Sequence, residues 1–160
     1  MISVTDSRVL DANSESLGVS VSTLMDNAGS ALSRFILERF PDKRTIFVCG
    51  TGNNGGDGFA AALRMPTETT TVALVKKSSQ IRSDISREKY AILECDIIPY
   101  TPGCLDGFDV VVDCVLGTGG EGILREPYRS CIQDINDSGK IVISADIPSG
   151  FGIDLCVVPD

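Results

Sequence analysis

A short, mostly apolar segment that runs directly into a glycine-rich stretch constrains the fold of this chain more than any other feature. Residues 45–49 (Thr-Ile-Phe-Val-Cys) have the continuous apolar character of a buried strand. Residues 50–58 (Gly-Thr-Gly-Asn-Asn-Gly-Gly-Asp-Gly) follow at once, and residues 59–64 (Phe-Ala-Ala-Ala-Leu-Arg) are helix-forming. A strand, a glycine-rich turn and a helix in this order are typical of the unit that binds nucleotides in α/β proteins.

The rest of the chain alternates between strand and helix patterns in the same way. An amphipathic helix is predicted over residues 20–40, where apolar side chains recur every three or four positions until Pro41. Further strands are predicted at residues 70–75, 97–100, 109–113 and 141–145, and helices at residues 83–94 and 127–136. Strands and helices of this length indicate right-handed βαβ units on a parallel sheet. We therefore expect an α/β fold, a Rossmann-like three-layer αβα sandwich with a mostly parallel central sheet and an N-terminal helical extension.

The length of 160 residues fits a single domain. Residues 1–40 would be the helical extension and residues 41–160 the α/β core. Residues 153–158 have the character of an approach to another strand, and the sequence stops at Asp160. Either the protein is naturally short or the core is truncated at its C-terminal end.

Composition excludes several classes of function. The chain has no histidine, which excludes Ser-His-Asp and Cys-His hydrolases. Its net charge of −8 argues against nucleic acid as a partner, and no apolar run approaches the roughly 18 residues of a membrane span. Its six cysteines form no CxxC pair, which excludes the common zinc-ribbon and thioredoxin patterns and favours reduced thiols in a cytoplasmic protein.

Two aspartates follow predicted strands and precede glycine-rich or turn-forming segments. Asp113 ends the strand at 109–113 and precedes residues 117–122 (Gly-Thr-Gly-Gly-Glu-Gly), and Asp146 precedes residues 147–150 (Ile-Pro-Ser-Gly). In a parallel sheet both carboxylates meet the 50–58 segment at the carboxyl edge, where such folds bind ligands. With Asn54 and Ser149 they form an oxygen-rich set suited to a hard cation, to sugar hydroxyls or to both. The alternative is that each aspartate is only a strand-end carboxylate satisfied by backbone N–H groups.

The Gly50-x-Gly52-x-x-Gly55 spacing matches the dinucleotide fingerprint, yet two features argue against a hydride-transfer site. Side chains of Asn53, Asn54 and Asp57 line the segment, whereas a plain phosphate cradle uses backbone alone. No acidic residue ends the next strand to hold a ribose, because residues 70–75 continue into Lys76. In the structural alternative, the glycines only make a tight turn and Asp57 caps the following helix.

Several of these segments together resemble one known family. Residues 50–58, 113–119 (Asp-Cys-Val-Leu-Gly-Thr-Gly), 125–128 (Arg-Glu-Pro-Tyr) and 146–150 (Asp-Ile-Pro-Ser-Gly) are similar to motifs of the YjeF N-terminal domain family. Residues 25–29 (Met-Asp-Asn-Ala-Gly) resemble its Met-Glu-Asn-Ala-Gly, with Asp26 in place of Glu. The resemblance extends from about residue 7 to residue 150 with every motif in family order.

The resemblance implies an activity and a set of site residues. Enzymatic members of the family interconvert the R and S forms of hydrated NADH and NADPH (NADHX and NADPHX), which carry a hydroxyl on C6 of the nicotinamide ring. An S-specific dehydratase then restores the cofactor, and the family suggests a homodimer formed through the N-terminal helix. The implied substrate contacts are Asn53, Asn54, Gly55, Gly56, Asp57 and Asp146, with the phosphates held by Gly117, Thr118, Gly119, Gly120, Glu121, Gly122 and Ile123. The implied potassium ligands are Asn54, Asp113 and Ser149.

Inverting C6 requires an acid that protonates the leaving hydroxyl, and in a histidine-free chain a carboxyl group is the expected agent. Asp146 is our first choice and Asp57 the reserve. Burial beneath a bound ring would favour the protonated acid, whereas a nearby cation would favour the carboxylate.

Other functions remain open from the sequence. The same domain resembles parts of RNA-decapping scaffolds and lipoprotein-binding proteins, so a catalytically silent nucleotide-binding or interaction scaffold is the main alternative. An ordinary NAD-dependent dehydrogenase is disfavoured by the missing ribose carboxylate. No basic residue is evidently placed for a 2′-phosphate, because Lys76 and Lys77 fit a solvated strand end better than an adenosine contact. The sequence therefore does not separate NADHX from NADPHX.

Overall fold

The structure, a computed structural model, describes residues 18–118 and 123–151. Within these residues five strands form one sheet in the order β3-β2-β1-β4-β5, and every neighbouring pair is parallel. The strands are β1 (Thr45–Cys49), β2 (Thr70–Leu74), β3 (Asp96–Pro99), β4 (Val110–Cys114) and β5 (Ile141–Ser144). All five lie within one residue of their predicted ends, so the strand predictions are confirmed.

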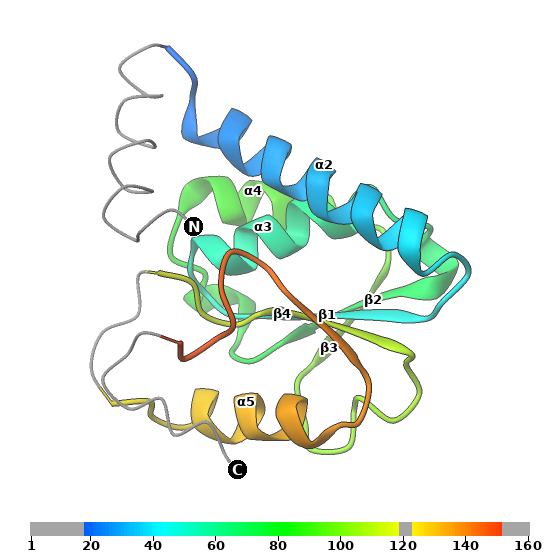
Figure 1. The fold of residues 1–160 in the computed structure, drawn as a ribbon. Coiled ribbons are helices and arrows are strands. Elements are labelled where there is room, and N and C mark those ends of the chain that lie inside the picture. Colours follow the sequence, from blue (N-terminus) through cyan, green and yellow to red (C-terminus); the bar gives the residue numbers. More distant parts are fainter. Residues whose placement is uncertain (1–17, 119–122, 152–160) are drawn as a thin grey trace.

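Helices cover both faces of the sheet (Figure 1). Helices α2 (Val21–Arg39), α3 (Asn53–Ala62) and α4 (Asp84–Ala91) lie on one face, and α5 (Tyr128–Asp137) lies on the other. This arrangement confirms the predicted Rossmann-like three-layer sandwich with an N-terminal helix. The predicted strand approach at residues 153–158 lies outside the described residues. Among the described helices, none combines the length and apolar character needed to cross a membrane.

Strand β1 lies at the centre of the core, since all five of its residues are buried. Phe47 and Cys49 pack with Phe59 of α3 on one face of the sheet. Ile46 and Val48 belong to the second apolar cluster, which faces α5. The alternation of side chains along a strand therefore supplies both layers from one continuous apolar run.

The glycine-rich segment is mostly helix, which corrects the expectation of a loop over residues 50–58. Helix α3 begins at Asn53, with Gly52 as an extended N-cap, so residues 53–58 form its first turns. Its glycines are required by close packing rather than by a turn, because a Cβ on Gly58 would lie 2.8 Å from the sulfurs of Cys49 and Cys114. A Cβ on Gly55 would overlap the carbonyl oxygen of Gly50. Glycine is a poor helix former, so this close approach outweighs local propensity.

Asp26 joins three helices on one face of the sheet. Its Oδ1 accepts from Arg64 Nη2 at 2.8 Å, just beyond α3, and its Oδ2 accepts from Lys89 Nζ of α4 at 2.7 Å. The bonds from Lys89 and then Arg64 hold the pKa of Asp26 below its usual range. The shorter Asp26 side chain, which stands where the family has Glu, is therefore long enough to hold both cations.

Gly58→Ala should lower the free energy of unfolding by about 1–3 kcal/mol, because overpacking forces α3 away from β1 and β4. The measurement is urea unfolding followed by circular dichroism. Gly52→Ala is the matched control, since a Cβ there meets no heavy atom within 4 Å and the backbone φ is −95°. Equal stability of the two variants would contradict the packing role of Gly58.

The stability difference between wild type and Asp26→Asn should depend on pH in a defined direction. Because the folded pKa of Asp26 is lowered, its contribution is complete above about pH 5 and is lost as the pH falls through the folded pKa. We expect at most about 1 kcal/mol, since the side chain is 34% exposed and solvent screens the pairs. Urea unfolding from pH 7 to pH 3 tests this.

Asp84→Asn is the control for that series, because Asp84 is 86% exposed in its pair with Arg87. It should change stability less than Asp26→Asn at every pH. A difference between wild type and Asp26→Asn that grows on acidification would contradict the assigned ion pairs.

Candidate functional site

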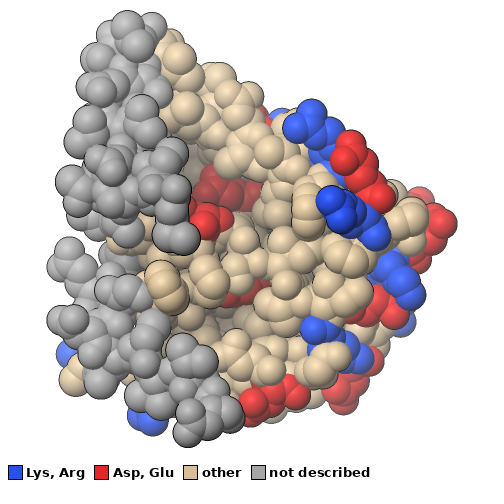
Figure 2. All heavy atoms as spheres, in the orientation of Figure 1, with Lys and Arg blue, Asp and Glu red and all other residues tan. Residues whose placement is uncertain are grey.

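Three strand ends meet at the carboxyl edge of the sheet, because β1, β4 and β5 are consecutive in the strand order. The turn after β1 leads into α3, Asp113 is the next-to-last residue of β4, and Asp146 lies two residues beyond β5. Figure 2 shows acidic side chains in a hollow of the viewed face, next to uncharged side chains of the described residues. The topology therefore brings together the segments that carry the predicted site residues.

Asp113 is buried and anchors the segment that follows β5. Its Oδ1 accepts from Ser149 Oγ at 2.5 Å and from Val115 N at 3.2 Å. Its Oδ2 accepts from Ser149 N at 2.8 Å and from Ser144 Oγ at 3.3 Å. Four donors match the roughly four acceptor positions of a carboxylate and compensate the cost of burying its charge. The hydrogen bonds of Asp113 therefore connect β4 to the loop that contains Asp146.

Ser149 completes this connection between the two loops. Besides its bonds to Asp113, its Oγ accepts from Leu116 N at 2.8 Å and lies 3.0 Å from the Leu116 carbonyl oxygen. Ser149 thus contacts the backbone just before Gly117. A cation bound at Asp113 and Ser149 would have to replace at least one of these hydrogen bonds.

Asp146 has an unusual backbone conformation and an exposed side chain. Its φ is +64°, a left-handed value that aspartate tolerates better than most residues. Its Oδ2 accepts from Thr118 N at 3.2 Å. Such local strain is concentrated at functional sites, where the surrounding structure holds it in place. The result is a carboxylate that faces the backbone of the loop after β4.

Gly117 is the point where three segments come together. A Cβ on this residue would lie 2.9 Å from Asp146 Oδ2 and 3.3 Å from Asn54 Cβ. Only a residue without a side chain lets α3, the loop after β4 and the loop after β5 approach this closely. The structure therefore brings Asn54, Gly117, Thr118 and Asp146 together.

Asn54 has a buried amide without a protein partner. The residue is 7% exposed, and neither its Oδ1 nor its Nδ2 forms a hydrogen bond within the described residues. Leaving such a group unsatisfied costs about 1–3 kcal/mol, so it needs an explanation. Beside Gly117 and Asp146, an amide with one acceptor and two donor hydrogens is suited to a polar ligand.

The other predicted residues of α3 differ in exposure and in what they pack against. Asp57 is half-buried inside α3, three residues after Asn54, so the alternative that it caps this helix is wrong. Asn53 is exposed at the helix start, and Gly55 packs on Gly50. Gly56 faces α2, where its Cβ would lie 2.6 Å from Met25 Cε.

The second glycine-rich segment is described only at its two ends. Gly117 and Thr118 belong to the cluster above, whereas Ile123 is 68% exposed. Residues Gly119, Gly120, Glu121 and Gly122 lie outside the described residues.

One contact near the site was not indicated by any sequence pattern. Tyr128, at the start of α5, places its hydroxyl 3.0 Å from Thr51 Oγ1 in the turn after β1. The ammonium of Lys76, after β2, lies 4.6 Å from the centre of the Tyr128 ring. The three residues are separated by tens of positions in the chain, so only tertiary structure reveals the cluster.

The cysteines near the site are not arranged as acids or nucleophiles. Cys49 and Cys114 are in register on β1 and β4 and are fully buried. A hydrogen bond with Cys49, together with burial, raises the pKa of the Cys114 thiol well above its usual range. Cys114 is therefore a neutral packing residue. Within the described part of the chain, no group of three His, Cys, Asp or Glu side chains forms a candidate metal centre.

Comparisons with known proteins agree on one family. The sequence model described as YjeF-related protein N-terminus matches residues 21–155. The bifunctional NAD(P)H-hydrate repair enzyme Nnr of Pyrobaculum aerophilum is 37% identical over 165 residues, which cover 95% of this chain and 33% of that protein. The enzyme of the same name from Archaeoglobus fulgidus is 34% identical over 155 residues, which cover 96% of this chain and 33% of that protein. The chain thus spans about a third of the length of these relatives.

A solved structure shows the same fold. The crystal structure of the yeast protein ynu0 (YNL200c) superposes with a TM-score of 0.80 and 20% sequence identity, covering 94% of this chain and 71% of that one. The sequence model and the two relatives cover the strands, the glycine-rich helix and the Asp146 loop described above. This chain belongs to the family of YjeF-related protein N-terminal domains.

Proposed function

We propose that this chain is an NAD(P)H-hydrate epimerase, which interconverts the R and S forms of NADHX and NADPHX. One observation carries the proposal: the buried, unpartnered amide of Asn54 lies beside Gly117, within reach of the loop that presents Asp146. This arrangement offers a polar ligand both hydrogen-bonding groups and a carboxyl group. Membership of this family, with relatives named as NAD(P)H-hydrate repair enzymes, supports this choice of reaction.

The proposed mechanism uses a single acid and base. Asp146 acts as the acid and gives a proton to the C6 hydroxyl, the C–O bond breaks, and water leaves as the lone pair of the ring nitrogen stabilises the cation. Water then adds to the opposite face of C6 and returns a proton to Asp146, so protons and electrons balance. Asp57 is the reserve acid. Asp146 is preferred because its carboxylate lies at the junction of the three segments, whereas Asp57 is half-buried within α3.

We propose the family's potassium ion as a cofactor at the same edge. Asn54, Asp113 and Ser149 would hold it, and the Oδ1 of Asn54 fits this role best because no donor within the described residues bonds to it. Oxygen donors of this kind suit a hard cation. A bound cation would supply positive charge near the substrate's phosphates.

The remaining partners follow from the family. We propose that the product is passed to an S-specific dehydratase, which is consistent with relatives named as bifunctional repair enzymes. We also propose a homodimer through the N-terminal helix and a cytoplasmic location, where the five described cysteines, all free, would stay reduced. The scaffold alternative is not favoured, because Asp57, Asp113 and Asp146 are all present and the relatives are named as enzymes.

The direct test incubates pure S-NADHX with the protein and follows R-NADHX by chromatography. We expect epimerisation well above the spontaneous rate, and faster in potassium buffer than in sodium buffer of equal ionic strength. Asp146→Asn should lower turnover by about 10²–10⁴-fold, the usual contribution of an acid–base group. Asp137→Asn, an exposed change on α5, is the matched control. A folded wild-type protein without acceleration would refute the epimerase, and unchanged turnover in Asp146→Asn would refute the assigned acid alone.

Asn54→Leu should separate stability from ligand binding. Replacing an unsatisfied buried amide with an apolar side chain of similar volume should leave the free energy of unfolding unchanged or raise it by about 1 kcal/mol. The stabilisation that potassium gives to the wild-type protein in urea unfolding should disappear. Asn53→Leu, at an exposed position, is the control. A loss of more than about 1 kcal/mol in Asn54→Leu would show a structural role instead.

A further inference from the structure

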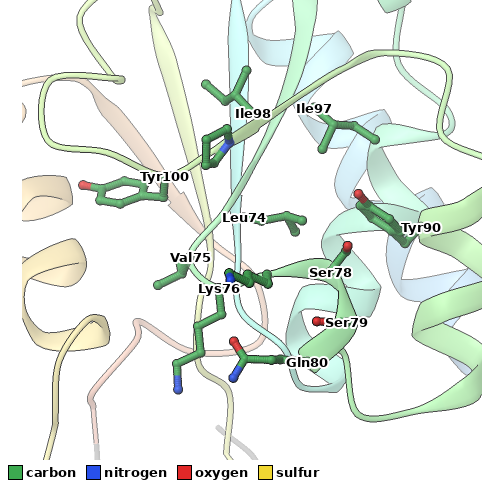
Figure 3. Close-up of a pocket in the computed structure, with 12 residues that line it drawn as sticks. Leu74, Val75, Lys76, Ser78, Ser79, Gln80, Tyr90, Ile97, Ile98 and Tyr100 are labelled. Atoms are coloured by element: carbon green, nitrogen blue, oxygen red, sulfur yellow. The ribbon is translucent and has the colours of Figure 1, made fainter.

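A second hollow lies at the carboxyl ends of β2 and β3, beside the candidate site. It has a volume of about 930 Å³, within the range of small-molecule sites. Leu74 and Ile97 lie on the α4 side of the sheet with Tyr90, whereas Val75, Ile98 and Tyr100 lie on the α5 side, so the hollow spans the end of the sheet (Figure 3). Polar residues that follow β2, among them Lys76 and Lys77, line the rest of it. We call this hollow the β2–β3 groove.

The strand order relates the groove to the candidate site. Strand β1 is flanked by β2 and β3 on one side and by β4 and β5 on the other. In open sheets of this order, a dinucleotide binds across the carboxyl edge, with its two halves on opposite sides of the turn after the first strand. Asp113 and Asp146 lie on the β4–β5 side, so the β2–β3 groove is the place left for the other half of such a ligand.

Two lysines lie at the position where dinucleotide-binding proteins contact the adenosine ribose. In nucleotide-binding folds of this topology, a residue about 20 positions after the glycine-rich turn contacts the ribose: an acid holds a 2′-hydroxyl, and a base accommodates a 2′-phosphate. Here β2 ends at Leu74, and Lys76 and Lys77 follow after Val75. The position that an acid would occupy is therefore cationic.

These lysines are available to bind an anion. Lys76 is half-buried, and its ammonium lies over the Tyr128 ring. The Tyr128 hydroxyl is hydrogen-bonded to Thr51 in the turn after β1. Lys77 is exposed. Within the described residues neither lysine forms an ion pair, whereas Lys43 and Lys89 are paired with carboxylates. In a chain with a net charge of −8, two adjacent lysines give this part of the surface a local excess of positive charge.

We propose that the β2–β3 groove binds the adenosine end of the substrate, and that Lys76 and Lys77 bind its 2′-phosphate, so that the protein prefers NADPHX to NADHX. The inference rests on the proposed epimerase function and adds to it a preference between the two substrates. Leu74, Ile97 and Tyr90 on the α4 side receive the adenine ring, and the polar residues after β2 receive the ribose and its phosphate.

The first experiment measures binding without turnover, by titration calorimetry of the full chain. The two probes are adenosine 2′,5′-bisphosphate and adenosine 5′-monophosphate, which differ only in the 2′-phosphate. Wild type should bind the bisphosphate about tenfold more tightly, as expected for one added charge-assisted contact. Changing Lys76→Ala and Lys77→Ala together should abolish that ratio, and the double arginine variant should retain most of it.

Lys43→Ala is the matched control, because Lys43 precedes β1 at the opposite, amino edge of the sheet. It should keep the wild-type ratio. Equal binding of the two probes by wild type, or an unchanged ratio in the double alanine variant, would overturn the proposal.

The second experiment compares kcat/KM for NADPHX and NADHX. The ratio should favour NADPHX in wild type and fall about tenfold in the double alanine variant. Epimerisation without any such preference would overturn the groove assignment and leave the proposed function intact. A preference for the bisphosphate without epimerisation would refute the proposed function and leave the nucleotide site standing.

Discussion

The close contact between α3 and the central strands is the constraint on which the rest of the site depends. Gly55 packs on the Gly50 carbonyl, and Gly58 packs between the sulfurs of Cys49 and Cys114. Any larger side chain would push the helix away from the sheet. Because the helix lies this close, Asn54 in its first turn is buried at the carboxyl edge of β1 rather than exposed above it. Close packing of these glycines therefore fixes the position of the Asn54 side chain.

Asp113 performs the corresponding role on the other side of β1. Its carboxylate accepts four hydrogen bonds, from Ser149 Oγ and N, Ser144 Oγ and Val115 N. A buried charge satisfied in this way is a rigid anchor, because loss of any donor leaves part of the charge uncompensated. The anchor holds the loop after β5, and with it the left-handed backbone of Asp146. The acid proposed for the reaction is thus positioned by a second carboxylate that accepts four hydrogen bonds in this structure.

The β4–β5 side and the β2–β3 side of the carboxyl edge of the sheet differ in charge. Asp113 and Asp146 lie on the β4–β5 side, and Lys76 and Lys77 lie on the β2–β3 side, with the turn after β1 between them. A ligand with a neutral reactive ring at one end and a phosphate at the other would bind in one orientation. The contact of Tyr128 with Thr51 and Lys76 links the lysine side to the turn. In our proposal, the β4–β5 side carries the reacting ring and the β2–β3 side selects the substrate.

The sequence by itself determined the fold class, the positions of the five described strands and the edge at which the candidate site residues meet. It could do so because apolar runs, their spacing and the carboxyl-edge rule are local or topological properties. It did not determine that the glycine-rich segment is a helix, because residues 53–58 have poor helix propensity and only their packing on β1 and β4 favours it. Nor did it reveal the unpartnered amide of Asn54, the saturation of Asp113 or the groove beside Lys76, since each depends on side chains distant in the chain. Burial and hydrogen-bond partners are decided by tertiary contacts alone.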